Sequence, residues 1–185
     1  MENTEIYTEN NEIEMERNLA GEGMLHIVSK TVWFSAAHIL NYEEKCGRLH
    51  GHNYKAHIQV SGNLIVGGMV INFDEISNLV KELDHHLILA KNQVKSMDED
   101  TVTFEVIKPN KKVKKYTVPR EDVIILNKVA ITAELLSEYL VYQCMNLLKD
   151  RYGHYISEPF KHYAVEISLE ETPSSVATFA GSEVI

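Results

Sequence analysis

The sequence predicts an α+β domain in which two helices stand between pairs of strands. Apolar and polar residues alternate over 54–62 and again over 163–169, as in half-buried strands. Apolar residues recur at helical spacing over 76–83 and over 135–148. Because the order along the chain is two strands, helix, helix and two strands, the α+β class follows. A length of 185 residues is enough for one domain with a full core.

The first 23 residues form an acidic segment that we expect to lie outside the folded domain. Residues 1–23 hold seven glutamates against the single basic residue Arg17, with few large apolar residues and no clear period. Such a segment buries too little apolar surface to offset the entropy cost of ordering its backbone. The sequence therefore predicts a disordered extension over 1–23 and a single domain over 24–185.

Residues 25–35 and 54–62 are the first two predicted strands. The first segment is rich in β-branched and aromatic residues, which strands favour. In the second segment the even-numbered residues are apolar and the odd-numbered ones polar. If this alternation continues back without a bulge, His50 and His52 share the inward face with Tyr54.

A turn, a short strand and a helix are predicted next. The glycines at 67–68 favour a turn, and 69–73 is short and apolar enough for a strand. Asp74 is the expected cap of a helix whose apolar residues over 76–83 form one stripe. This helix would deliver the Asp-His-His sequence at 84–86 at its C-terminal end.

A second helix and two last strands complete the predicted domain. The helix is expected to begin near Thr132, with Glu134 in its first turn, and to end at Gly153. The strands are expected over 163–169 and 176–180.

The segment 91–127 interrupts this plan. Two alternating stretches, 101–107 and 112–118, flank the turn sequence at 108–111 and predict a β-hairpin insert. A solvated elaboration of the fold is one interpretation. The alternative is that its lysines contact a substrate phosphate or another subunit.

Composition and charge exclude several classes of protein. The chain is 44% hydrophobic and 24% charged, which is typical of globular proteins. It has no run of roughly 18 apolar residues and no basic-then-apolar leader, so we expect a cytoplasmic protein. The net charge of −9 argues against nucleic-acid binding. Cys144 fits a helical apolar pattern, so Cys46 and Cys144 do not indicate a disulfide framework.

Three histidines and a cysteine form the motif that carries chemistry. His50 and His52 are spaced i, i+2, and His38 ends an apolar run a dozen residues earlier. Three neutral imidazoles leave one position of a tetrahedral zinc open, as in catalytic sites. Cys46, four residues before His50, would serve as a base or nucleophile beside the metal. The alternative is that Cys46 completes a closed structural site.

These motifs resemble the superfamily of 6-pyruvoyltetrahydropterin and 6-carboxytetrahydropterin synthases. The resemblance rests on Phe-Ser-Ala-Ala-His at 34–38, Cys-x-x-x-His-Gly-His at 46–52 and Leu-Asp-His-His at 83–86, in this order. It covers most of the chain except for a gap near 91–130. The short run between the cysteine and the first histidine of the second motif matches the 6-carboxy branch better, because biopterin-type members carry a longer run there.

The resemblance implies a tunnelling fold (T-fold). In this fold an antiparallel β-sheet carries two helices on one face, and several subunits together close an oligomeric barrel. Family members form homo-oligomers, trimers or hexamers, with the pterin pocket at a subunit interface. The resemblance also implies that zinc is held by His38, His50 and His52.

The activity that the resemblance implies is a zinc-dependent carbon–carbon lyase reaction. It converts 7,8-dihydroneopterin triphosphate to 6-carboxy-5,6,7,8-tetrahydropterin and releases acetaldehyde and triphosphate, in queuosine and 7-deazapurine biosynthesis. Two alternatives stay open: a 6-pyruvoyltetrahydropterin synthase, and a non-catalytic zinc-binding module of the same fold.

A proton relay is the implied role of the Asp-His pair after the first helix. A carboxylate such as Asp84 fixes the tautomer of the neighbouring His85, which in turn can hold Cys46 as a thiolate. The alternative is that Asp84 caps a helix end and one histidine packs. Which of His85 and His86 reaches Cys46 stays open.

Three further residues are implied in substrate binding. Glu171 has the same parity as the apolar residues over 163–169, so it should lie on the buried face, where a carboxylate needs partners. In the family a glutamate before a threonine anchors the amino-pyrimidine edge of the pterin. Thr132 and Glu134 resemble a second family signature that contributes to the same pocket, although helix capping is an alternative for both.

Overall fold

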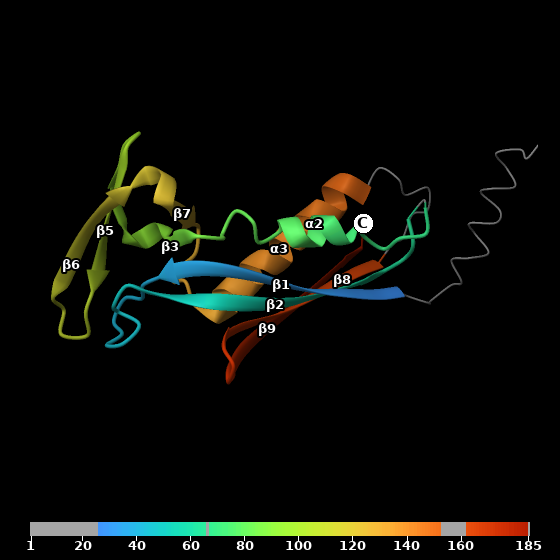
Figure 1. The fold of residues 1–185 in the computed structure, drawn as a ribbon, viewed down its shortest axis with the longest axis horizontal. Coiled ribbons are helices and arrows are strands. Elements are labelled where there is room, and N and C mark those ends of the chain that lie inside the picture. Colours follow the sequence, from blue (N-terminus) through green and yellow to red (C-terminus); the bar gives the residue numbers. More distant parts are fainter. Residues whose placement is uncertain (1–25, 66, 153–161, 185) are drawn as a thin grey trace, which may run out of the picture.

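A computed structural model describes residues 26–65, 67–152 and 162–184 (Figure 1). The predicted extension over 1–23 lies outside these residues, and so does Gly153, the expected end of the second helix. Among the described residues, no helix is both long enough and apolar enough to cross a membrane.

A six-stranded sheet is the main body of the fold. Its strands are β1 (His26–His38), β2 (His50–Gly62), β3 (His86–Ala90), β7 (Val123–Leu126), β8 (His162–Thr172) and β9 (Ser175–Val184), in the order β7-β3-β1-β2-β8-β9. The pairs β1–β2, β2–β8 and β8–β9 are antiparallel, whereas β3 pairs parallel with both β1 and β7. The predicted α+β fold is confirmed, but the sheet is mixed and not antiparallel throughout as expected, because the chain reaches β3 and β7 through crossovers instead of hairpins.

The strands predicted from alternation are present and longer than expected. β2 runs back to His50 without a bulge, so that His50 pairs with His38 and His52 pairs with Ala36. The predicted strand over 69–73 is absent, and Met69 forms an isolated bridge with Ile65. The helix α2 already begins at Phe73, inside this segment, which leaves too little length for a strand.

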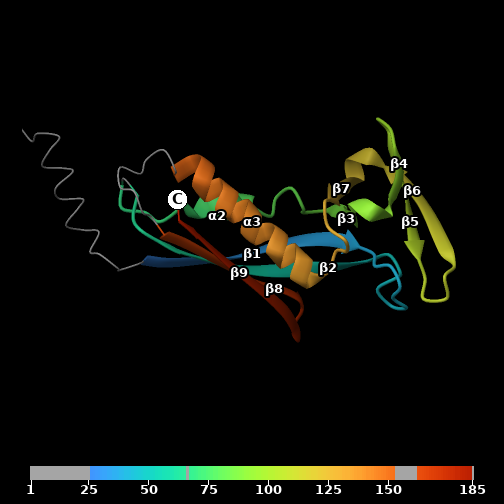
Figure 2. The same cartoon turned by 180° about the vertical axis from the view of Figure 1, so that it is seen from behind.

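Two helices cover one face of the sheet (Figure 2), as predicted. α2 spans Phe73–Asn78, and its N-cap is Asn72, whose side chain accepts a hydrogen bond from Asp74 N–H at 2.8 Å. Asp74 is therefore in the first turn and is not the cap that we expected. The helix is shorter than predicted, because residues 79–85 form turns, so the Asp-His-His sequence at 84–86 does not follow the helix end directly as we expected. α3 spans Ala133–Tyr152 and begins where the sequence predicts.

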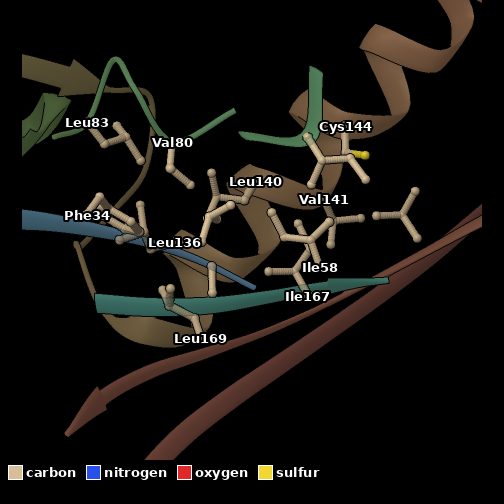
Figure 3. Close-up of a cluster of buried hydrophobic side chains, with 14 of the residues drawn as sticks. Phe34, Ile58, Val80, Leu83, Leu136, Leu140, Val141, Cys144, Ile167 and Leu169 are labelled. Carbon is tan, nitrogen blue, oxygen red and sulfur yellow. The ribbon is translucent and has the colours of Figure 1, made fainter. Parts of the chain in front are cut away.

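The main core lies between α3 and the sheet. Figure 3 shows side chains of α3 (Leu136, Leu140, Val141, Cys144) meeting those of β1, β2 and β8 (Phe34, Ile58, Ile167, Leu169). Cys144 is fully buried, as its apolar pattern predicts, and burial raises the pKa of its thiol to about 12. Truncating a fully buried leucine here to alanine would cost about 2–5 kcal/mol of stability.

A second sheet of three strands stands beside β3 and β7. It consists of β4 (Val94–Met97), β5 (Thr101–Ile107) and β6 (Val113–Pro119), with the short 3-10 helices η1 (Lys91–Gln93) and η2 (Arg120–Asp122) at its borders. The predicted hairpin is confirmed as β5 paired with β6. One face of β5 is buried against β3 and β7 in a second cluster, made of Ile39, Leu87, Leu89, Val102, Phe104, Val106 and Val123. The hairpin is thus part of a packed sheet.

Candidate active site

Three histidines from β1 and β2 meet on the face of the sheet that the helices cover. One ligand atom from each of His38, His50 and His52 lies within 4.8 Å of those of the other two. His38 and His50 are partners in the strand register, and their Nε2 atoms are 3.1 Å apart. His52 joins them because residues two apart on a strand share a face.

Backbone carbonyls fix the tautomers of two of these rings. His38 Nδ1 lies 2.6 Å from Ile131 O, and His50 Nδ1 lies 2.7 Å from Arg48 O. A carbonyl accepts hydrogen bonds, so each Nδ1 carries the proton and each Nε2 presents a lone pair. Two lone pairs facing each other at this separation are unfavourable without a cation or proton between them. Burial lowers the pKa of His38, which favours the neutral, metal-binding form. This donor set fits zinc.

Cys46 and the predicted pocket residues line one cavity next to these histidines. The cavity has a volume of about 250 Å³, and its lining includes His38, Cys46, Thr132, Glu134 and Glu171. The structure therefore brings these five residues together from three separate parts of the chain.

Glu171 lies at an irregularity in the pairing of β8 with β9. The register shifts between Glu170 and Thr172, which leaves Glu171 without a strand partner on β9. An extra residue of this kind re-aims a side chain. Glu171 Oε1 accepts a hydrogen bond from Tyr54 Oη at 3.2 Å and lies 3.9 Å from His38 Nε2. The carboxylate thus has the partners that its predicted position requires.

Tyr54 is a site residue that we did not predict from the sequence. It is fully buried, and its ring stacks on Phe34 with centroids 4.9 Å apart. Burial and then the nearby Glu171 carboxylate raise the pKa of Tyr54, so its hydroxyl stays a donor. The sequence did hold a sign of this role, because Tyr54 is even-numbered like His50 and His52 and so lies on the same face of the strand.

Thr132 and Glu134 both begin α3 and line the cavity. Thr132 Oγ1 accepts a hydrogen bond from Leu135 N–H at 3.4 Å, which is a capping contact. The pKa of Glu134 is lowered by its own backbone N–H and then by the Thr132 hydroxyl. Capping and a place in the pocket therefore occur together for these two residues.

Asp84 and His85 form a hydrogen-bonded pair elsewhere. His85 Nδ1 lies 2.9 Å from Asp84 Oδ2, and Ser35 N–H donates to Asp84 Oδ1 at 2.7 Å. The Ser35 amide and then His85 lower the pKa of Asp84. His85 adopts a φ of 61°, a conformation seldom seen for residues other than glycine. His86 instead contacts the Asp84 carbonyl oxygen, with Nδ1 at 2.8 Å.

His85 and Cys46 do not line the same cavity. His85 and His86 line a larger hollow of about 700 Å³, together with residues of β1 and β2 that include His52 and with Val118 and Asp122. The side chain of His85 is 82% exposed. Within one chain, His85 of the predicted relay pair and the predicted catalytic thiol therefore line two separate cavities.

Comparison with known proteins gives a consistent set of relatives. Residues 27–182 match the protein-family profile described as 6-pyruvoyl tetrahydropterin synthase. The chain is 38% identical over 122 residues to a Pyrococcus horikoshii protein named putative 6-carboxy-5,6,7,8-tetrahydropterin synthase, covering 63% of this chain and 74% of that protein. A Haemophilus influenzae protein named 6-carboxy-5,6,7,8-tetrahydropterin synthase is 38% identical over 71 residues, 33% of this chain and 50% of that one.

Solved structures with a similar fold carry related names. A 6-pyruvoyl tetrahydropterin synthase from Plasmodium vivax superposes with a TM-score of 0.64 at 23% identity, covering 85% of this chain and 99% of that one. The Plasmodium falciparum protein of the same name gives a TM-score of 0.60 at 27% identity, with 87% and 99% covered. The T-fold predicted from the sequence is thereby confirmed.

Proposed function

Because this chain belongs to the 6-pyruvoyl tetrahydropterin synthase family, we propose that it is a zinc-dependent carbon–carbon lyase acting on a pterin. The proposed reaction converts 7,8-dihydroneopterin triphosphate and water to 6-carboxy-5,6,7,8-tetrahydropterin, acetaldehyde and triphosphate. The names of the curated relatives support the carboxy branch. The observation that carries the proposal is the cavity in which Cys46 and Glu171 adjoin the histidine cluster.

Zinc is the proposed cofactor, held by His38, His50 and His52. Three imidazole ligands leave a coordination position for substrate, and the carbonyl contacts of His38 and His50 hold those two rings in the metal-binding tautomer. When bound, zinc would act as a Lewis acid that acidifies the side-chain hydroxyl groups of the substrate.

Cys46 and Glu171 are the proposed catalytic and anchoring residues of the cavity. Glu171 accepts hydrogen bonds from the amino-pyrimidine edge of the pterin, and the hydroxyl of Tyr54 holds one of its oxygens in place. Cys46 moves protons on the side-chain carbons of the substrate while triphosphate leaves. Thr132 and Glu134 complete the wall of the pocket at the start of α3.

The proton relay through Asp84 and His85 requires a second copy of the chain. Asp84 accepts the Nδ1 proton of His85, which leaves Nε2 as the proton acceptor. Because His85 and Cys46 line different cavities, we propose that His85 of one subunit serves Cys46 of another. In the described sheet the edge strands are β7 and β9, whose outer backbone groups suit pairing with a neighbour in an oligomeric barrel.

The product of the proposed reaction would enter queuosine and 7-deazapurine biosynthesis. The proposal places the activity in the cytoplasm, where a catalytic thiol such as Cys46 stays reduced.

Product analysis tests the proposed reaction. The purified zinc-loaded protein is incubated with 7,8-dihydroneopterin triphosphate, and the pterin products and acetaldehyde are measured by mass spectrometry. We expect 6-carboxytetrahydropterin and acetaldehyde in equal amounts. The family description and the names of the solved structures favour 6-pyruvoyltetrahydropterin synthase as the second candidate. Its product without acetaldehyde would replace our assignment, and zinc binding without any product would indicate a non-catalytic module.

A further inference from the structure

The loop that carries Cys46 is closed by its own backbone. This loop, residues 39–49, joins β1 to β2. Leu40 N–H donates a hydrogen bond to Cys46 O at 2.8 Å. Gly47 is buried at a point where a Cβ atom would collide with the Glu43 carbonyl oxygen. The position of Cys46 therefore depends on the position of Leu40.

The three-stranded sheet binds this loop directly after Leu40. Asn41 Oδ1 accepts a hydrogen bond from Ile107 N–H at 2.9 Å, and Tyr42 N–H donates to Ile107 O at 2.6 Å. Ile107 is the last residue of β5, and both of its backbone polar groups face the loop. The loop thus takes the place that a neighbouring strand would have at this end of β5.

The region around η1 holds the loop directly before Leu40. Gln93 is buried, and its Nε2 donates to Ile39 O at 3.0 Å while its Oε1 accepts from Ala90 N–H at 3.0 Å. The side chain of Ile39 is fully buried in the second cluster, beside Phe104 of β5. Both flanks of Leu40 are therefore attached to the segment that begins at η1 and ends with β5.

We propose that the three-stranded sheet positions the Cys46 thiol and that Asn41 is the positioning residue through which it acts. Figures 1 and 2 show the loop and the end of β5 side by side at one end of the molecule. A proton-transfer group must lie within hydrogen-bond range of the reacting atom, so a small displacement of the loop lowers the rate. This inference rests on the proposed function for the importance of the thiol, but the placement of the thiol is measurable without substrate.

The test compares three variants of the full chain. Asn41→Ala removes the acceptor of the Ile107 N–H, whereas Asn41→Asp keeps an oxygen at that position. Asn110→Ala is the matched control, because Asn110 Oδ1 accepts from Lys112 N–H at 3.1 Å at the exposed tip of the same hairpin. Each variant is treated with iodoacetamide, and labelling of Cys46 is followed by peptide mass spectrometry. Cys144 is buried and serves as an unlabelled reference.

A positioning role predicts a change confined to one variant. Asn41→Ala should change the labelling rate of Cys46 by about threefold or more and should lower kcat on the order of tenfold with KM nearly unchanged. Asn41→Asp and Asn110→Ala should label and turn over as the wild type does. Zinc content should be equal in all four proteins.

Several results would overturn the positioning role. One is an Asn41→Ala protein with the labelling rate and kcat of the wild type. Another is an equal change in Asn110→Ala, which would indicate a general effect of weakening the hairpin. If Asn41→Ala does not fold, Asn41→Ser, whose hydroxyl is too short to reach the Ile107 N–H, is tested with the same readouts.

The labelling result also separates this inference from the proposed function. If the wild type turns over no substrate but Asn41→Ala still alters the labelling of Cys46, this inference stands and the proposed function is refuted.

Discussion

His38 and His50 present Nε2 to each other because the Nδ1–H of each ring donates a hydrogen bond to a backbone carbonyl. The carbonyls belong to Ile131, which precedes α3, and to Arg48, which lies in the Cys46 loop. The predicted motif therefore needs two backbone groups, one distant in the sequence and one local, to hold its rings as metal ligands. The sequence predicted that the three histidines cluster, because alternation puts His50 and His52 on one strand face and His38 ends the preceding apolar run. It could not predict the carbonyl partners, because the Ile131 carbonyl is brought in by long-range packing and the Arg48 carbonyl by the conformation of the loop before β2.

Replacing His50 by alanine should remove the metal. The wild type should hold about one zinc per chain, and two remaining imidazoles bind zinc too weakly to retain it through gel filtration. Metal content is measured by inductively coupled plasma mass spectrometry. The matched control is His57→Ala, a residue on the opposite, exposed face of β2 whose Nδ1 lies 3.2 Å from Thr31 Oγ1. Full zinc occupancy in His50→Ala would mean that the proposed ligand set is wrong.

Sequence patterns predict some of the elements that carry the site better than others. Alternation predicted β2 and β8, which contact a core on one face, and helical spacing predicted α3, which presents one apolar stripe. β1 was predicted from its β-branched and aromatic residues. β3 and β7 read as short apolar runs, His-Leu-Ile-Leu-Ala and Val-Ile-Ile-Leu. Such runs have no alternation because strands covered on both faces are apolar throughout, and this pattern alone does not identify a strand.

The end of β8 decides which of two adjacent glutamates enters the site. Lys55 Nζ donates to Glu170 Oε1 at 2.8 Å, on the face away from the helices, whereas Glu171 turns toward Tyr54 and His38. Parity along the strand predicted this correctly. The shift in the pairing of β8 with β9 was not predictable, because it depends on the register of the partner strand.

Substitutions at these two positions should have unequal effects. Glu171→Gln removes a charged acceptor for the pterin edge, so kcat/KM should fall about 10- to 100-fold, mainly through KM. Glu170→Gln is the matched control, because the same chemical change on the opposite face weakens only a half-buried ion pair with Lys55. Steady-state kinetics and zinc content are measured for both. Equal kinetic losses in the two variants would argue against Glu171 as the anchor.

At the scale of the whole molecule, the two halves of the proposed catalytic machinery are separated within one chain. Cys46 lines the smaller cavity and His85 lines the larger one, which also contacts the three-stranded sheet through Val118. The order of motifs in the sequence predicted that both would be present. It could not predict that they lie apart, because the distance between two loops depends on the path of every strand between them.

Two inactive variants should therefore restore activity to each other when they assemble together. Cys46→Ala and His85→Ala each lose a different half of the machinery, and both should keep zinc, since neither residue is a proposed ligand. If each site combines Cys46 of one subunit with His85 of another, random co-assembly leaves about a quarter of the sites complete. The two proteins are co-expressed with different affinity tags, purified through both tags and assayed with 7,8-dihydroneopterin triphosphate. Mixed oligomers with no more activity than the separate variants would show that His85 does not act across a subunit boundary.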